Sequence, residues 1–403
     1  MKAVILAGGR GSNLNPITET RSKTMINICG KPVLEYTILG LKDAGIADCC
    51  IVVDHKGEKI KEYFESGEKL GVSITYVEQK PPKNIGGALM SSADRFSEGG
   101  YFLLVYGDVV FSSNIFLTTL MSFNSLKGAI ATICIPPAPG QYGNIYMNEE
   151  VQITKIIEKP EHEKFGNYIL AGVFVLPVSF FELLNAAKCD IEKAFDSLIK
   201  TNGLHASIYE DDWIDIGYPW NIIDANKIQM KKIKKTSISP SAHIEENVTI
   251  KGPVVVEDNV IIKAGATIIG PCYLGEGCFV GNNSLIREYT SLGAKSVVGF
   301  GVEIKNSIIF ERAAIGRLSF IGDSVIGEGV DIGPNVVTVN RDIDRQTIKT
   351  EIKGKKIDSK LEKLGAFVGD NSIIGASNTI LPGMIIPHKA KLKHKGSIHN
   401  GDL

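Results

Sequence analysis

The sequence has almost no net charge, no long apolar run and no paired cysteine motif. Lys and Arg total 44 against 45 Asp and Glu, so there is no overall basic field to attract nucleic acid or an anionic membrane. The first residues lack a charged-then-apolar leader, and no apolar run approaches the length of a membrane-spanning helix. We therefore expect a cytoplasmic protein with small-molecule substrates, and neither nucleic acid nor a membrane as a partner.

Two common phosphate-binding motifs are also missing from the glycine-rich loop at residues 7–14. A P-loop needs glycine, lysine and Ser or Thr in succession, and a dinucleotide fingerprint needs glycine where Leu14 stands. Gly8, Gly9 and Gly11 still allow several backbone N–H groups to converge on an anion. The loop therefore indicates phosphate binding of another kind, with an ordinary strand-to-helix turn as the structural alternative.

The 403 residues are enough for two or three domains, and the first half alternates between two patterns. Apolar strand-like runs occupy residues 3–6, 49–53, 74–77 and 101–105, and helical spacing occupies residues 32–42, 58–70 and 87–96. This alternation predicts an α/β, Rossmann-like domain with a parallel, helix-covered sheet. Ligands of such sheets bind beyond the carboxyl ends of the strands, where both the glycine loop and Asp108 fall.

A six-residue repeat fills the second half, after the basic run at residues 231–235. The recurring aliphatic or Phe positions are Ile244, Ile250, Val256, Ile262, Ile268, Leu274, Val280, Ile286, Leu292, Val298, Ile304 and Phe310. The phase slips by one at Ile315 and again at Ile326, and the repeat resumes at Val368. This period predicts a parallel β-helix built from hexapeptide repeats. We therefore expect two domains, at residues 1–230 and 231–403.

Two details of the repeat half bear on its chemistry. The seven cysteines are an odd number without metal-ligand spacing, which indicates reduced thiols. Cys272 and Cys278 occupy equivalent repeat positions, so we expect them in the core. The charged insert at residues 341–363 interrupts the repeat, and it is either a functional excursion or a solvated loop.

Together with Pro16, Thr18 and Lys23, the glycine loop resembles the signature of the sugar-1-phosphate nucleotidylyltransferases. The resemblance covers roughly residues 1–230. It implies Mg²⁺-dependent transfer of a nucleotidyl group from UTP or dTTP to a sugar 1-phosphate, with release of pyrophosphate. The nucleoside triphosphate and the sugar 1-phosphate are then the expected small-molecule partners.

The same resemblance implies a role for each matching residue. The catalytic set is Lys23, Asp108, Lys159 and Asp215, with Asp108 and Asp215 as the Mg²⁺ ligands. The nucleotide would be bound by Ala7, Gly8, Gly9, Gly11, Ser12, Gln79 and Gly86, with Gln79 reading a pyrimidine. The sugar would be bound by Gly143, Glu158, Lys159 and Gly172.

Several positions depart from that family's pattern. Asn13 stands where an arginine usually grips the phosphates, and an amide does not supply that cation. Leu170 replaces an asparagine that usually binds the sugar, and residues 84–87 lack the usual Gly-Thr pair. Glu192-Lys193-Ala194 stands where Thr-Asp-Ala is common.

The second half resembles that of archaeal bifunctional proteins that also carry an amino-sugar-1-phosphate acetyltransferase. The matching segments are residues 320–327, Asn340, residues 354–355 and residues 363–367. The resemblance implies a left-handed β-helix and a homotrimer. Arg317 stands at the position of the histidine base and Phe320 at that of a tyrosine, whereas Asn340 and Lys363 match. A guanidinium stays protonated, so we expect a degenerate acetyltransferase site that makes no use of acetyl-CoA.

Three functional interpretations are compatible with these residues. The leading one is an active nucleotidylyltransferase whose β-helix mainly assembles the oligomer. Asn13 and Leu170 favour the second, a non-catalytic regulatory or assembly paralogue that binds sugar nucleotides. The third, a bifunctional enzyme with a rebuilt acetyltransferase site, needs a base that the sequence does not identify.

Overall fold

The computed structural model describes residues 1–96, 99–135, 144–157 and 168–395. By its internal contacts the chain divides into two compact units. The first contains Met1–Arg10, Ser22–Met25 and Pro32–Asp215, and the second contains Gly11–Arg21, Ile26–Lys31 and Ile216–Leu403. The predicted domain boundaries are 1–230 and 231–403. They differ from this grouping in the short segments Gly11–Arg21 and Ile26–Lys31 and in residues 216–230, and they stay a prediction.

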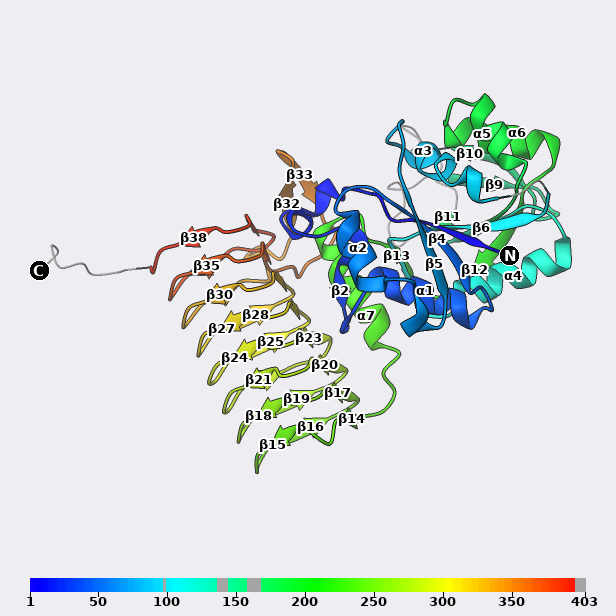
Figure 1. Cartoon of the computed structure of the whole chain (residues 1–403). Helices are drawn as coiled ribbons and strands as arrows, with labels where there is room; N and C mark the ends of the chain where they lie inside the picture. The colour runs from blue at the N-terminus through cyan, green and yellow to red at the C-terminus, as the bar shows by residue number, and fades with distance from the viewer. Residues whose placement is uncertain (97–98, 136–143, 158–167, 396–403) are drawn as a thin grey trace, which may run out of the picture. The chain divides into compact units, whose positions relative to one another are not determined.

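A seven-stranded sheet forms the centre of the first unit, in the order β12-β8-β11-β6-β1-β4-β5 (Figure 1). Its strands are β1 (Ala3–Leu6), β4 (Asp48–Val53), β5 (Ser73–Glu78), β6 (Tyr101–Tyr106), β8 (Ile130–Cys134), β11 (Ile169–Pro177) and β12 (His205–Tyr209). The four predicted strands are confirmed as β1, β4, β5 and β6, and all pair in parallel. Only β11 runs antiparallel, to both β6 and β8. The sheet is therefore mixed at one side and parallel around β1.

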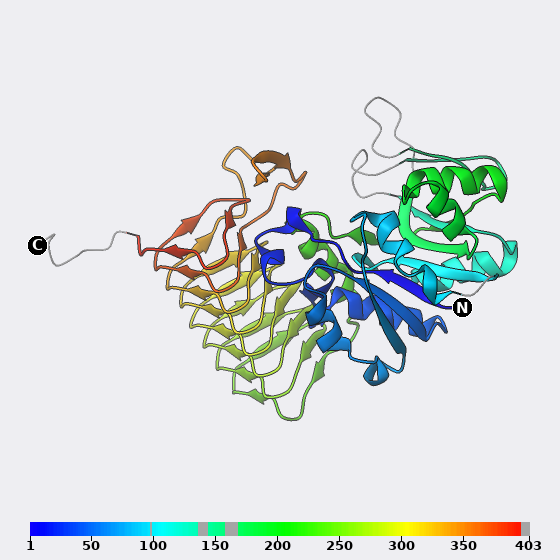
Figure 2. The same cartoon turned by 45° about the horizontal axis from the view of Figure 1, so that its top comes forward.

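Helices cover both faces of this sheet (Figure 2). They are α1 (Val33–Asp43), α2 (Gly57–Phe64), α3 (Ile85–Met90), α4 (Ile115–Leu126), α5 (Phe180–Ala186) and α6 (Ile191–Thr201). Ala3 and Ile5 of β1 face the cluster that includes α1, α2 and α4, whereas Val4 faces the cluster that includes α3, α5 and α6. This alternation is what a strand buried on both faces requires.

Side-chain caps fix where three of these helices begin. Asn84 accepts a hydrogen bond from the N–H of Gly87, and Asn114 accepts one from the N–H of Phe116. Asp190 caps α6 in the same way. Each cap satisfies a backbone donor that the first helical turn leaves unpaired.

The second unit contains a left-handed parallel β-helix of three long sheets (Figure 1). The first sheet has β14 (Ser237–Ile238), β17 (Val254–Val256), β20 (Cys272–Leu274), β23 (Thr290–Leu292), β26 (Ile308–Ile309), β29 (Val325–Ile326), β34 (Phe367–Val368) and β37 (Ile385–Ile386). The second has β15 (His243–Ile244), β18 (Ile261–Ile262), β21 (Phe279–Val280), β24 (Val297–Val298), β27 (Ala314–Ile315), β30 (Asp331–Ile332), β35 (Ile373–Ile374) and β38 (Lys391–Leu392). The third has β16 (Thr249–Lys251), β19 (Thr267–Ile269), β22 (Leu285–Ile286), β25 (Glu303–Lys305), β28 (Phe320–Gly322), β31 (Val337–Thr338) and β36 (Thr379–Ile380).

The coil register confirms the hexapeptide repeat and corrects one position in it. Ile262 pairs with Val280, which is three hexads later, so each coil stacks an aliphatic on the next. The slip comes one repeat earlier than predicted, at Ile309 instead of Ile315, because Leu292 pairs with Ile309. Ile309 therefore joins the interior cluster, and Phe310 lies outside that column although it is also buried.

The buried thiols agree with the core assignment made from the repeat. Cys272 and Cys278 are fully buried in the interior cluster, and burial raises the pKa of each to about 12. All seven cysteines are free thiols. These two cysteines therefore act as apolar packing groups.

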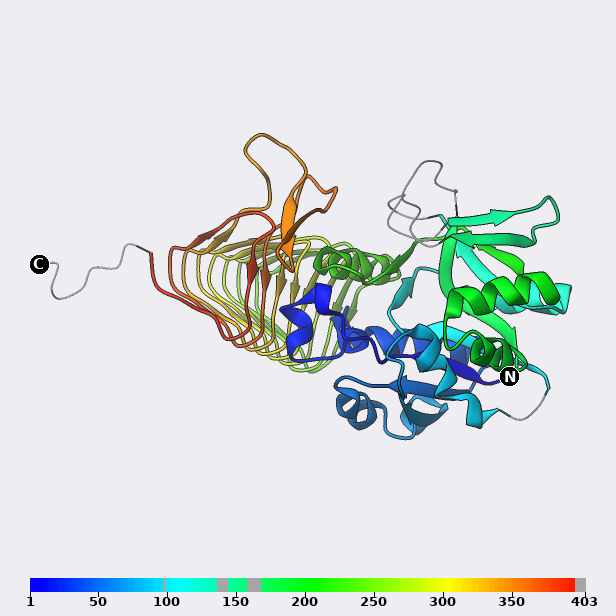
Figure 3. The same cartoon turned by 90° about the horizontal axis from the view of Figure 1, so that it is seen from above.

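The insert between β31 and β34 forms an antiparallel hairpin of β32 (Lys349–Ile352) and β33 (Lys355–Asp358). Figure 3 shows this hairpin, in orange, projecting from the stack of coils. Ile348 and Ile352 are buried, and a Cβ added at Gly383 would meet Ile348 Cγ2 at 2.8 Å. The insert is therefore partly packed against a later coil.

The second unit also holds a helix and a short hairpin, except for Pro32, the last residue of the hairpin, which is grouped with the first unit. The hairpin pairs β2 (Asn27–Ile28) with β3 (Lys31–Pro32), and the helix is α7 (Pro219–Met230). Asn226 of α7 accepts a hydrogen bond from the N–H of Cys29 at 3.0 Å and donates one to the carbonyl of Tyr289 at 3.0 Å. In the part of the chain that the structure describes, no helix is long and apolar enough to span a bilayer.

Candidate functional site

A cleft of about 300 Å³ lies in the first unit at the carboxyl ends of the parallel strands. Gly8 and Gly9 follow β1, Gln79 follows β5, and Asp108 lies in the turn between β6 and β7 (Val109–Phe111). These groups meet because parallel strands end at one edge of the sheet. Lys23, at the start of the 3₁₀ turn Lys23–Met25, completes this side of the cleft.

Lys23 and Asp108 form an ion pair inside the cleft. The Lys23 ammonium donates a hydrogen bond to Oδ2 of Asp108. Their side chains are 14% and 26% exposed, so both charges are partly withdrawn from water yet open to a ligand. The pair thus combines a cation for phosphate oxygens with a hard oxygen ligand for a metal ion.

Asp215 reaches the same end of a two-stranded ribbon as Asp108. β13 (Trp213–Asp215) pairs antiparallel with β7, and Asp215 lies opposite Val109, the residue after Asp108. The indole Nε1 of Trp213 donates to the carbonyl of Ala171 at 3.0 Å, which fixes this strand against the sheet. The ribbon therefore places the backbones of the two acids near one another, although the sequence separates them by more than a hundred residues, and of the two Asp108 lines the cleft.

Gln79 lies directly over the glycine loop. A Cβ at Gly8 would come within 2.9 Å of Gln79 Oε1 and 3.1 Å of Asp54 Cβ, so a larger residue here would displace the Gln79 amide. Gln79 Nε2 donates to the carbonyl of Asn84 at 2.9 Å. Gly86 lies in α3, where a Cβ would be 2.2 Å from the carbonyl oxygen of Cys189, which explains the glycine by close packing.

Three charged residues of the cleft were missed from the sequence. Asp54, Lys83 and Arg10 line it, and Lys83 donates to Asp54 Oδ1 at 2.7 Å and to the carbonyl of Gln79 at 2.6 Å. Asp54 comes directly after β4, so its place at a strand's carboxyl end was the available signal.

The predicted sugar-binding residues are only partly described. Gly143, Glu158 and Lys159 lie outside the described residues. Gly172 is at a bulge of β11 with φ +78°, and a Cβ there would meet Tyr106 Cβ at 3.1 Å. Tyr106 lines the cleft, so the bulge packs Gly172 against its wall.

The remaining loop residues fall in the other unit. Ala7, Gly8 and Gly9 belong to the first unit, whereas Gly11, Ser12 and Asn13 are grouped with the β-helix. Gly11 has φ +60° and precedes the 3₁₀ turn Ser12–Leu14. The division of this signature between two units was not predicted.

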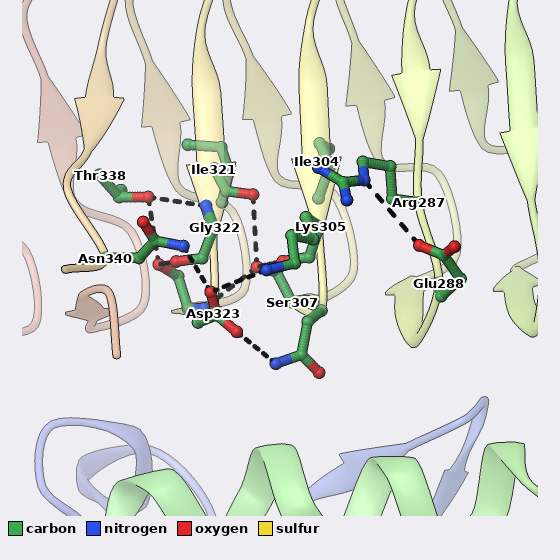
Figure 4. A network of polar contacts seen from close by, with 12 residues as sticks. Arg287, Glu288, Ile304, Lys305, Ser307, Ile321, Gly322, Asp323, Thr338 and Asn340 are labelled. Atoms are coloured by element: carbon green, nitrogen blue, oxygen red, sulfur yellow. Dashed lines mark hydrogen bonds and ion pairs between the residues drawn. The ribbon is translucent and has the colours of Figure 1, made fainter. Parts of the chain in front are cut away.

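A polar network surrounds Asp323 on the β-helix (Figure 4). Asp323 is buried and accepts hydrogen bonds from Asn306 and Asn340, each at 2.5 Å, while Lys305 Nζ lies 3.8 Å from its carboxylate. Oδ1 of Asn306 is buried without a hydrogen-bond partner among the described residues. Two amides thus hydrogen-bond one buried carboxylate, and the Lys305 ammonium compensates its charge.

Of the predicted degenerate acetyltransferase residues, Arg317 and Phe320 lie on one coil, Asn340 follows β31 on the next, and Lys363 lies at the end of the insert. A Cβ at Gly322 would meet the ring of Phe320 at 2.7 Å and Nδ2 of Asn340 at 2.9 Å, so these two residues are neighbours. Arg317 is exposed in the turn between β27 and β28, and Lys363 pairs with Arg341 at an isolated bridge. The Phe320 ring carries no titratable group, so it is not an acid or a base.

Among the described residues, no group of three or more His, Cys, Asp and Glu side chains is arranged to hold a metal ion. The two predicted ligands are Asp108, which lines the cleft, and Asp215, which lies at the same end of the β7–β13 ribbon. This donor set fits Mg²⁺, which is commonly held by one or two carboxylates together with substrate phosphates and water.

Comparison with known protein families and solved structures agrees with this architecture. The family described as nucleotidyl transferase matches residues 2–232, and the GMPPB C-terminal domain matches residues 268–396. Among solved structures, a putative glucose-1-phosphate thymidylyltransferase from Bacillus anthracis is 26% identical, with a TM-score of 0.52 over 56% of this chain and 94% of its own. A UDP-glucose pyrophosphorylase complexed with UDP-glucose, 23% identical with a TM-score of 0.52, shares the fold over 57% of this chain and 98% of its own.

Two archaeal relatives match over nearly their full length. A bifunctional sugar-1-phosphate nucleotidylyltransferase/acetyltransferase of Sulfurisphaera tokodaii is 37% identical over 100% of this chain and 98% of its own length. A protein named bifunctional protein GlmU, from Methanocaldococcus jannaschii, is 35% identical over 95% of this chain and 91% of its own length. These matches confirm the resemblance stated from the motifs: the chain belongs to the nucleotidyl transferase family, with a β-helical second half like that of the archaeal bifunctional proteins.

Proposed function

We propose that this protein transfers a nucleotidyl group from UTP or dTTP to a sugar 1-phosphate, with Mg²⁺ as the metal. An oxygen of the sugar phosphate forms a bond to the α-phosphorus, and the bond from that phosphorus to the bridging oxygen of pyrophosphate breaks. The observation that carries the proposal is the Lys23–Asp108 ion pair in the cleft, with Asp215 at the same end of the β7–β13 ribbon. The relatives' names support the choice of substrates.

Each side chain of the cleft has a task in this proposal. Lys23 binds phosphate oxygens and holds the triphosphate in line for transfer, where positioning and charge stabilisation supply most of the rate. Gln79, fixed by its hydrogen bond to Asn84, would read the edge of the pyrimidine. Asp108 and Asp215 would hold Mg²⁺, which when bound neutralises the charge of the phosphates.

A non-catalytic paralogue that binds sugar nucleotides is the second candidate, because Asn13 does not supply an arginine's charge. We expect Asn13→Arg to raise kcat for pyrophosphate release by about ten- to a hundredfold, because a cation near the transferred phosphate stabilises charge in the transition state. The measurement is steady-state release with the matched control Asn13→Gln. An unchanged rate in an active enzyme would mean that another group already supplies this charge. If the wild type and Asn13→Arg are both inactive while sugar nucleotides raise Tm, the paralogue is favoured.

We also propose that the β-helix assembles a homotrimer. Support comes from an apolar ladder on its second sheet, where Ile261, Phe279, Val297 and Ala314 lie in register on consecutive coils. Ile261 and Val297 are 38% and 42% exposed, and a contiguous exposed apolar surface favours association. Sedimentation should give three times the chain mass of 43.6 kDa, and Val297→Asp should give single chains. Lys391→Glu, at the polar end of this sheet, is the control, and a wild type that sediments as single chains contradicts the trimer.

A further inference from the structure

The signature loop between Arg10 and Ser22 is grouped with the β-helix rather than with the sheet. It contains the 3₁₀ turns Ser12–Leu14 and Ile17–Glu19, and Leu14 and Ile17 are fully buried. The Thr18 hydroxyl donates a hydrogen bond to the carbonyl of Gly11 at 2.8 Å, which joins two parts of the loop that are seven residues apart. The loop is therefore an ordered element with its own packing.

Arg21, the last residue of the loop, is buried on the β-helix. Its side chain is 7% exposed and forms ion pairs with Asp370 and, at 3.1 Å, with Glu328. The guanidinium also lies over the ring of Phe310, 4.6 Å from its centroid. The Thr20 hydroxyl donates to the same Asp370 oxygen. One end of the loop is thus fixed to two acids more than 300 positions later in the chain, Glu328 and Asp370.

Asp370 is held in place by hydrogen bonds other than those with Arg21. Its side chain is only 2% exposed, and its second oxygen accepts the N–H of Glu328 at 2.8 Å. Its main-chain carbonyl accepts the N–H of Lys389 at 2.9 Å, on the next coil. Because this carboxylate is already fixed, it offers Arg21 a single geometry, and little conformational freedom is lost when the ion pair forms.

A second contact near Asp370 holds the middle of the loop. A Cβ added at Gly369 would come within 2.7 Å of Pro16 Cβ, so the missing side chain leaves space for Pro16. Pro16 is buried. Gly369 and Asp370, two consecutive residues after β34, therefore form one contact surface for the loop. Gly369 contacts Pro16, and the Asp370 carboxylate pairs with Arg21.

Burying an ion pair withdraws both charges from water, so its net stabilisation is small and its value lies in specifying one arrangement. We infer that Arg21 and Asp370 are a positioning pair that holds the signature loop on the β-helix in the conformation that nucleotide binding requires. The loop is continuous with Gly9 at one end and with Lys23 at the other, so its displacement would disturb both. The inference rests on the proposed nucleotidyl transfer for its kinetic consequence only.

The test compares the full-length protein with Asp370→Asn, which keeps the shape of the side chain and removes its charge. We expect KM for the nucleoside triphosphate to rise by about tenfold or more and kcat to fall, with KM for the sugar 1-phosphate unchanged. The reason is that a misplaced binding loop lowers the reaction rate even when the substituted residue lies far from the reacting atoms. Hydrogen exchange of residues 11–21 should become faster while exchange of the coils stays the same. Asp331→Asn, an exposed aspartate on another coil, is the control.

Separate readouts distinguish failure of this inference from failure of the proposed function. If the wild type releases no pyrophosphate, hydrogen exchange alone decides, since the anchor does not depend on activity. Unchanged exchange and unchanged KM in Asp370→Asn would overturn the inference, as would an equal loss of Vmax with both KM values preserved. Should Asp370→Asn not fold, Glu328→Gln removes the weaker partner of Arg21 and must show the same changes at smaller size.

Discussion

Asp108→Ala should lower kcat for pyrophosphate release by at least about a hundredfold at saturating Mg²⁺ and substrates. The substitution removes a hard oxygen ligand and leaves the Lys23 ammonium without its carboxylate partner. Since little acid–base chemistry is needed in this transfer, the fold loss in kcat should be nearly the same at each pH between about 6 and 8. Steady-state release measured over this range checks both statements.

The controls for Asp108 separate metal binding from folding. Asp94→Ala changes an exposed aspartate of the same unit and should leave kcat unchanged. Asp108→Glu keeps the carboxylate, so its activity should exceed that of Asp108→Ala and should depend more steeply on Mg²⁺ concentration. Full activity of Asp108→Ala with an unchanged Mg²⁺ requirement would contradict the assignment of this residue.

The wild type should show no acetyl transfer to amino-sugar 1-phosphates, and the double variant Arg317→His with Phe320→Tyr should gain it. A neutral imidazole accepts the amine proton that a guanidinium does not, and general base catalysis contributes about 10²- to 10⁴-fold. Asn340, next to the Phe320 ring, is already present and bonded to Asp323. Release of coenzyme A thiol from acetyl-CoA is the measurement.

The matched control for this gain is Arg317→Gln with Phe320→Tyr, which removes the cation without adding a base. It should stay as inactive as the wild type, while pyrophosphate release by all three proteins stays the same. Acetyl transfer by the wild type at the rate of the double variant would contradict the prediction and favour a rebuilt bifunctional site.

Periodicity predicted the fold well because each period corresponds to one kind of packing. The six-residue repeat of aliphatic side chains is possible only in a three-sided coil, and the strands of the first sheet alternate with helices as a parallel sheet requires. The position of the slip was predicted wrongly at Phe310, because Ile309 and Phe310 are both apolar and hydropathy does not distinguish them. The partner of Phe310, the Arg21 guanidinium, comes from a distant segment.

The candidate site was predictable where residues follow strands and unpredictable where distant segments meet. Lys23, Gln79 and Asp108 line one cleft. The strand pattern placed the glycine loop and Asp108 at this edge of the sheet, whereas Gln79 was named only from the family resemblance. Lys83 was missed because a lone lysine in a loop is usually solvated, and its bond to Asp54 becomes visible only in three dimensions. The contact surface for the signature loop at Gly369 and Asp370 has no sequence signal of its own, since the same pair of residues, Gly322-Asp323, stands elsewhere in the repeats without contacting the loop.

Pyrophosphate release across a panel of nucleoside triphosphates and sugar 1-phosphates with Mg²⁺ tests the claim that the Lys23–Asp108 cleft transfers nucleotidyl groups. We predict release with UTP or dTTP and one class of sugar 1-phosphate, and its loss in Asp108→Ala. No release with any pair, while sugar nucleotides still raise Tm, would contradict the claim and leave a protein that binds sugar nucleotides without transferring them.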